Sequence, residues 1–175
     1  MIKRALAGVA LLMAMVASLE GAAAARAADL DVLIRSLNFL IDPPAGNVDL
    51  AVVYDSASSA SSADARNIVD LAKDKKGAGF TLVPRLIDER SLEGLGSAEL
   101  VLLAAGADAL FAPVFAQARA NKTLVVSLHQ NCIDLDLCVM WVKGKPDVRI
   151  VLNRAAAQLV NARFNTTFRM MVQER

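Results

Sequence analysis

The sequence predicts an α/β protein: a single three-layer domain with a mostly parallel sheet, flanking helices and a C-terminal antiparallel hairpin. Strand-like apolar runs alternate along the chain with segments of helical periodicity. These runs are nearly continuous and rich in β-branched residues, which is typical of parallel strands covered on both faces. The last two runs are separated only by residues 143–147, and so short a connection allows only an antiparallel hairpin.

Helices are expected between the strands, and right-handed crossovers would place them on both faces of the sheet. A first helix, near residues 30–40, carries Leu30, Leu33 and Leu37 on one face and ends before Pro43. Ser62 is the expected N-cap of the next helix. The expected strands are residues 48–54, 80–86, 100–104 and 123–128, followed by the hairpin strands 138–142 and 148–152.

Two prolines and the C-terminal tail refine this order of elements. Pro84 lies inside the second strand and indicates an edge position, because proline cannot donate a ladder hydrogen bond. Pro113 suits the first turn of a helix that presents Phe111 and Phe115 on one face. A short alanine-rich helix is expected near residues 154–160, and Phe164, Phe168 and Met171 have the spacing of a packed terminal helix.

The first 27 residues read as a cleavable signal peptide, which leaves residues 28–175 as one domain. Lys3 and Arg4 precede an apolar run, residues 5–19, that is shorter than the roughly 20 residues of a membrane-spanning helix. Small side chains at the −3 and −1 positions of Ala25-Arg26-Ala27 predict cleavage near Ala27. An uncleaved membrane anchor is the alternative. The sequence therefore predicts an exported, periplasmic protein.

Net charge narrows the range of partners. Residues 1–27 contain three basic side chains and one acidic, so 16 of the 19 basic and 17 of the 18 acidic residues remain in the predicted mature chain. Nucleic acids and anionic membrane surfaces select a concentrated positive field. A nearly neutral chain argues against both of them as partners.

The two cysteines, Cys132 and Cys138, lie close together in a chain predicted to enter an oxidising compartment, where a disulfide is the natural pairing. A zinc or copper site is the alternative, because His129, Asp134 and Asp136 add nitrogen and oxygen donors nearby. The spacing H-x2-C-x5-C matches no known ligand pattern, which favours the disulfide. No metal and no cofactor are expected.

The serine-rich segment 55–62 follows the first predicted strand, where open α/β sheets commonly bind ligands. Hydroxyl groups and free helix N–H groups there can hold an anion, so Ser56, Ser58 and Ser59 are the candidate ligand contacts. The segment has no glycine and matches no phosphate-binding loop, so a solvated loop is the competing interpretation.

Catalysis would most naturally use His129, the only histidine. No nucleophile motif accompanies this residue, so the sequence predicts no enzyme and no catalytic residues. Trp141, Met170 and Met171 could form a surface for a partner, but core packing is the expected use of each.

Two segments near the C-terminus carry a family resemblance, VRIVLNRAA at residues 148–156 and FNTTFRMM at residues 164–171. They resemble the end of the YfiR family of small periplasmic proteins, in which a late strand ends in Asn, an Ala pair follows, and an amphipathic helix with Ser or Thr closes the chain. The segment KTLVVS at residues 122–127 falls in matching order. The chain departs from the family at residues 37–43, which lack the usual Trp-Pro ending, and at 132–138, where cysteines flank the segment.

This resemblance implies a periplasmic regulator that acts by protein–protein contact. The family includes a repressor that docks on the periplasmic region of an inner-membrane diguanylate cyclase, which implies such a cyclase or a membrane sensor as the partner and cyclic di-GMP as the signal. The alternative function is a periplasmic small-ligand-binding protein resembling one lobe of a substrate-binding protein, motivated by residues 51–56. A second copy of the chain, in a homodimer, is a further partner that the sequence leaves open.

Overall fold

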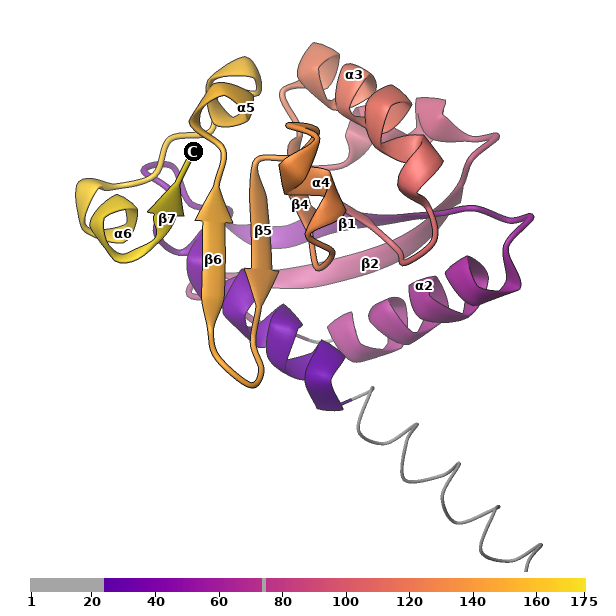
Figure 1. Cartoon of the computed structure of the whole chain (residues 1–175), viewed down its shortest axis with the longest axis horizontal. Coiled ribbons are helices and arrows are strands. Elements are labelled where there is room, and N and C mark those ends of the chain that lie inside the picture. The colour runs from indigo at the N-terminus through magenta and orange to yellow at the C-terminus, as the bar shows by residue number, and fades with distance from the viewer. Residues whose placement is uncertain (1–23, 74) are drawn as a thin grey trace, which may run out of the picture.

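The computed structural model describes residues 24–73 and 75–175. These residues form a seven-stranded sheet, in the order β2-β1-β3-β4-β5-β6-β7, and the helices that flank it (Figure 1). The strands from β2 to β5 are mutually parallel, β6 runs antiparallel to β5, and β7 is parallel to β6. The predicted fold class is confirmed. The strands are β1 (Gly46–Tyr54), β2 (Phe80–Asp88), β3 (Leu100–Leu103), β4 (Leu124–Ser127), β5 (Met140–Lys143), β6 (Arg149–Leu152) and β7 (Gln173–Glu174).

Helices flank the sheet on two sides, with α2 below and α3 above it in the view of Figure 1. The connections β1-α2-β2 and β3-α3-β4 run in opposite directions along the sheet, so crossovers of one hand place their helices on opposite faces. An N-terminal helix, described over residues 24–37, starts earlier than predicted. The other helices are α2 (Ser59–Ala72), α3 (Phe111–Asn121), α4 (Asn131–Asp134), α5 (Arg154–Leu159) and α6 (Thr166–Met171), with 3-10 helices η1 (Leu92–Ser97) and η2 (Asp108–Leu110).

The core lies against the central strands. All four residues of β3 and all four of β4 are buried, as expected for strands covered on both faces. Strand β1 emerges from its exposed start into the buried run Leu50–Val53. Burial of each large aliphatic side chain contributes on the order of 1.5–3 kcal/mol, so these strands hold the two helical layers together.

Two predictions concern the connection from β1 through α2 to β2. Pro84 lies in β2, which is an edge strand as predicted. The prediction of Ser62 as the N-cap of α2 is wrong. Ser58 has extended backbone angles, and its Oγ accepts the N–H of Ser61 at 3.2 Å, so the helix begins at Ser59.

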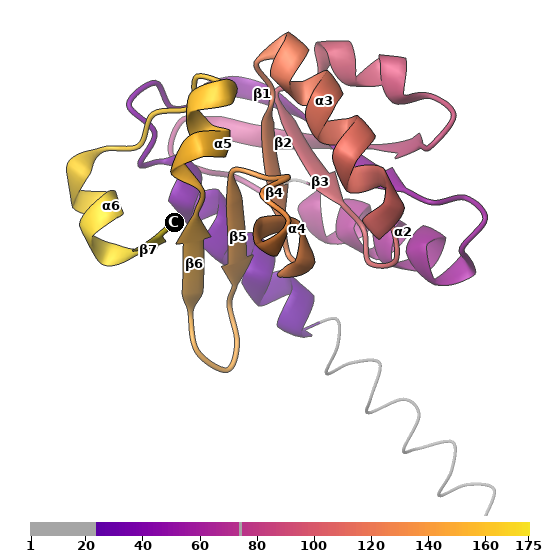
Figure 2. The same cartoon turned by 45° about the horizontal axis from the view of Figure 1, so that its top comes forward.

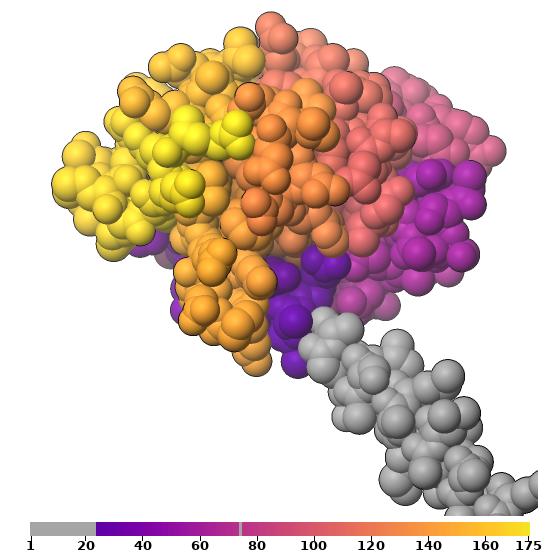
Figure 3. Space-filling view, viewed as in Figure 1, coloured from indigo at the N-terminus to yellow at the C-terminus, as the bar shows by residue number. Residues whose placement is uncertain are grey.

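The C-terminal segment forms a layer of its own beside the hairpin (Figure 2). Phe168 stacks on Phe39 and on Phe164, with ring centroids 5.0 and 5.2 Å apart. The predicted terminal helix is only partly correct, because Phe164 forms a β-bridge with Leu40 and the helix begins at Thr166. This layer covers one end of the molecule in the space-filling view (Figure 3).

The predicted core packing is right for Trp141 and wrong for the two methionines of α6. Trp141 is buried as expected, whereas Met170 and Met171 are 76% and 63% exposed because they lie on the outer side of α6. Val148, the first residue of the predicted strand 148–152, is exposed and precedes β6, which begins at Arg149.

The predicted signal peptide falls mainly on residues 1–23, which lie outside the described residues. Within residues 24–73 and 75–175, none of the helices combines the length and the apolar character that a membrane crossing requires.

Candidate functional site

Two regions of the described structure bring functional side chains together. The first is the carboxyl edge of the parallel strands. Connections leave β1 and β3 in opposite directions, and doubly wound sheets bind ligands outside the carboxyl ends of their strands at such a reversal. The serine-rich segment follows β1, Gly106 follows β3, and His129 follows β4.

The three predicted serine contacts have different surroundings at this edge. Ser58 caps α2, with its hydroxyl accepting the N–H of Ser61. The hydroxyl of Ser56 donates to Glu89 Oε1 at 2.6 Å. Ser59 is exposed in the first turn of α2. Two of the three hydroxyls therefore hold the local structure, and a ligand contact by any of them stays a prediction.

Sequence reasoning missed a cluster centred on Asp64 at the same edge. Asp64 Oδ2 accepts the N–H of Ala105 at 2.7 Å, and Oδ1 accepts Nη2 of Arg26 at 2.8 Å. His129 Nε2 lies 3.7 Å from Asp64 Oδ2 and 3.3 Å from Arg26 Nη2. The cluster joins the N-terminal helix, α2 and the loops after β3 and β4.

Opposing effects set the pKa of Asp64. Burial raises the pKa, while contacts with His129, the N–H of Ala105 and the guanidinium of Arg26 lower it, and the net result lies below the usual value. Asp64 is thus held as a carboxylate. No sequence signal distinguishes this residue from the other acidic side chains of an amphipathic helix.

The cysteine segment forms a disulfide between Cys132 and Cys138, with Cα atoms 5.7 Å apart and both side chains fully buried. Among residues 24–73 and 75–175, no three His, Cys, Asp or Glu side chains are grouped so as to hold a metal ion. Asp136 instead accepts the side-chain amide of Asn153 at 2.7 Å. The nitrogen, sulfur and oxygen atoms that could ligate a metal lie close together in the sequence, but in the described structure they make separate contacts.

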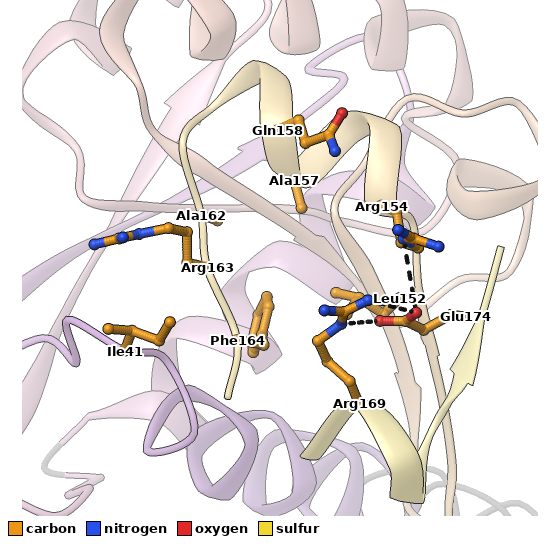
Figure 4. A pocket seen from close by; sticks show the side chains of 10 residues that line it. All are labelled: Ile41, Leu152, Arg154, Ala157, Gln158, Ala162, Arg163, Phe164, Arg169 and Glu174. Carbon is orange, nitrogen blue, oxygen red and sulfur yellow. Dashed lines mark hydrogen bonds and ion pairs between the residues drawn. The ribbon is translucent and has the colours of Figure 1, made fainter. Parts of the chain in front are cut away.

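The second region is a pocket of about 250 Å³ in the C-terminal layer, called here the C-terminal pocket (Figure 4). Leu152 in its wall pairs with Met140, the first residue of β5. The pocket therefore lies beside the start of β5 and the end of β6. Its lining residues are Ile41, Leu152, Arg154, Ala157, Gln158, Ala162, Arg163, Phe164, Arg169 and Glu174.

Positive charge exceeds negative charge in this lining, with three guanidinium groups and one carboxylate. Arg169 donates to Glu174 through Nε at 2.5 Å and Nη2 at 3.1 Å. Arg154 Nε lies 3.7 Å from Glu174 Oε2. In Figure 4 both guanidiniums turn toward Glu174, while Arg163 points away from them. Arg163 pairs with Asp42 at 2.8 Å.

These contacts hold the charges in place. The hydrogen bonds from Arg169 lower the pKa of Glu174, and the same bonds raise the pKa of Arg169. Two oxygens of Glu174 cannot occupy all the donors of two guanidiniums, since each guanidinium has five N–H groups. Arg154 and Arg169 thus retain donors for a further oxyanion.

Apolar side chains complete the pocket beside this polar end. Ile41 is 52% exposed, and Leu152, Ala162 and Phe164 line the same space. The arrangement suits a small molecule with one carboxylate and one apolar part, because guanidinium groups bind carboxylates with matching planar geometry. Sequence reasoning missed this site. The one available signal was the composition of residues 154–175, which contain four arginines and a single acidic residue.

Neither a family model nor a curated protein matches this chain. Solved structures do match it. One is a conserved domain protein from Vibrio cholerae, with a TM-score of 0.62 and 10% identity over 85% of this chain and 59% of that one. A ligand-free, open substrate-binding protein with adhesive properties from Clostridium difficile has a TM-score of 0.61 and 11% identity, over 84% of this chain and 58% of that one.

A third structure is described as the ABC domain in complex with L-Trp from Streptococcus pneumoniae. It has a TM-score of 0.59 and 9% identity, over 85% of this chain and 59% of that one. The chain shares its fold with these proteins. It spans somewhat under three fifths of the length of each of the three structures. At such low identity the likeness concerns the fold alone.

Proposed function

We propose that this chain is an exported small-ligand-binding protein that acts without catalysis and takes a small amphipathic carboxylate in the C-terminal pocket. The observation that carries the proposal is the pairing of two guanidiniums, Arg154 and Arg169, with the apolar wall of Ile41, Leu152 and Phe164. The carboxylate lies against Arg154 and Arg169, and the apolar part of the ligand covers the wall.

Fold and compartment support this proposal. Two of the similar structures are described as a substrate-binding protein and as a domain in complex with L-Trp. The disulfide fits a periplasmic or extracellular location, where thiols become oxidised. These likenesses favour ligand binding over a contact-only regulator.

Thermal unfolding tests the ligand class with four probes. Phenylacetate and L-tryptophan carry both a carboxylate and an apolar part, benzyl alcohol lacks the carboxylate, and acetate lacks the apolar part. We expect the first two to raise the melting temperature by about 5–10 °C at a hundredfold excess over Kd. Equal shifts with all four probes, or no shift with any, would contradict the proposal.

Variants locate the site. Arg154→Gln should abolish the shift caused by phenylacetate while the ligand-free protein still melts cooperatively. Arg119→Gln is the matched control, because Arg119 is exposed on α3 outside the pocket. An unchanged shift in Arg154→Gln would place the ligand elsewhere, with the carboxyl edge near Asp64 as the next site to probe.

A second candidate function is the regulator implied by the resemblance to the YfiR family, acting on an inner-membrane diguanylate cyclase or sensor. The exposed side chains of Met170 and Met171 favour it, since adjacent exposed apolar residues are typical of contact surfaces. Met170→Glu should then raise cellular cyclic di-GMP and abolish recovery of a membrane partner in pull-downs. Leu135→Glu, at a side chain of comparable exposure on another part of the fold, is the control.

A further inference from the structure

The N-terminal helix is joined to the rest of the domain through its first described turn. The side chains of Arg26 and Asp64 are each only 15% exposed, and their charged atoms lie 2.8 Å apart. Arg26 also lies 3.8 Å from Asp29 and 3.3 Å from His129. Removing Arg26 would leave the largely buried carboxylate of Asp64 without its charged partner, which strongly destabilises a fold. Arg26 therefore stabilises the folded domain.

The hairpin between β5 and β6 contacts the same turn. The N–H of Gly144 donates to Asp29 Oδ1 at 2.7 Å. A Cβ atom at Gly144 would lie only 2.4 Å from the backbone of Ala28, so the helix and the hairpin pack backbone to backbone. Chain ends fray when nothing holds them, and a chain beginning at Ala28 would leave both contacts on its terminal residues.

We infer that the mature protein retains Arg26, and that signal peptidase hydrolyses the bond after Ala23, Ala24 or Ala25. Hydrolysis adds the elements of water across that peptide bond and leaves a free carboxylate on the leader and a free amine on the mature chain. Small side chains stand at both the −3 and the −1 position for each of these bonds, because residues 21–25 are Gly-Ala-Ala-Ala-Ala. The sequence therefore allows cleavage before Arg26 as well as after Ala27. The contacts of Arg26 in the folded domain favour cleavage before Arg26.

Intact mass and N-terminal sequencing of the untagged full chain, expressed as the precursor and purified from the periplasm, test this inference. The expected N-terminus is Ala24, Ala25 or Arg26. An N-terminus at Ala28 or beyond would overturn the inference, and so would a chain that retains Met1.

Thermal unfolding gives an independent readout on the same exported protein. Arg26→Ala should lower the melting temperature by at least about 3 °C, because it removes one partner of a mostly buried ion pair. Arg35→Ala, at an exposed residue of the same helix, should leave the melting temperature unchanged. If cleavage removes residue 26, the Arg26→Ala precursor yields the wild-type mature protein, and an unchanged melting temperature would reject the inference.

Discussion

The hydroxyl of Ser56 and its backbone N–H both donate to the carboxylate of Glu89, at 2.6 and 2.8 Å. The two bonds join the loop after β1 to the residue that follows β2. They stabilise the ionised form and lower the pKa of Glu89 to about 2, from an ordinary value of 4.5. Ser56, predicted as a ligand contact, thus uses its hydroxyl within the protein.

This pair predicts a dependence of stability on pH. Because the pKa of Glu89 is lower in the folded than in the unfolded state, its contribution is present above pH 4.5 and is lost as the pH falls toward 2. Ser56→Ala should return the pKa of Glu89 toward 4.5, as followed by NMR titration of the side-chain carboxyl carbon. Ser59→Ala should leave this titration unchanged, and identical curves for the two variants would contradict the prediction.

Two asparagine caps allow a matched comparison. Asn153 accepts the N–H of Ala156 at 2.9 Å and also donates to Asp136, with only 2% exposure, whereas Asn165 caps α6 through the N–H of Phe168. Asn165→Ala should cost about 1 kcal/mol and Asn153→Ala about 2 kcal/mol, because the latter also loses a buried hydrogen bond. Urea unfolding measures both, and a smaller loss at Asn153 would contradict this order.

Gly144 provides a packing test. In Gly144→Ala the new Cβ would meet the backbone of Ala28 at 2.4 Å, so the hairpin and helix must separate. We expect a loss of about 1–3 kcal/mol in the free energy of unfolding. Gly96→Ala is the control, since the nearest atom to its Cβ would be 3.9 Å away. Equal stabilities of the two variants by chemical unfolding would show that the close approach does not exist in solution.

The disulfide predicts that a reductant lowers the stability of the protein and that a metal chelator does not. Reduction, or Cys132→Ala with Cys138→Ala, should lower the free energy of unfolding by about 2 kcal/mol, because the bond closes a short loop in the unfolded chain. EDTA should leave the melting temperature unchanged. If EDTA destabilised the protein and a reductant did not, a metal site would replace the disulfide.

Local patterns predicted most of the elements, since each is encoded by neighbouring residues. The continuous apolar runs placed β1, β3 and β4 to within about two residues, and Pro84 correctly indicated the edge strand. Errors arose where several residues could fill one role. Ser58 and Ser62 are equally good N-caps by composition, and only the extended backbone at Ser58 distinguishes them.

The tail was harder to predict for a related reason. Phe164, Phe168 and Met171 have helical spacing, yet Phe164 pairs with Leu40 in a β-bridge. The partner of that bridge is more than a hundred residues away along the chain, so no local pattern contains it. The short strand β7 is equally invisible, because two residues carry no periodicity.

By itself the sequence determined the α/β class, the alternating order of strands and helices, and the hairpin, because periodicity and connection length are local properties. Only the tertiary structure decided which distant side chains meet. It places Asp64 of α2 against Arg26 and the loop after β3, and it gathers Arg154, Arg169 and Glu174 from three elements around one pocket. Strand order and helix docking bring these groups together, and both depend on the burial of apolar surface across the whole domain.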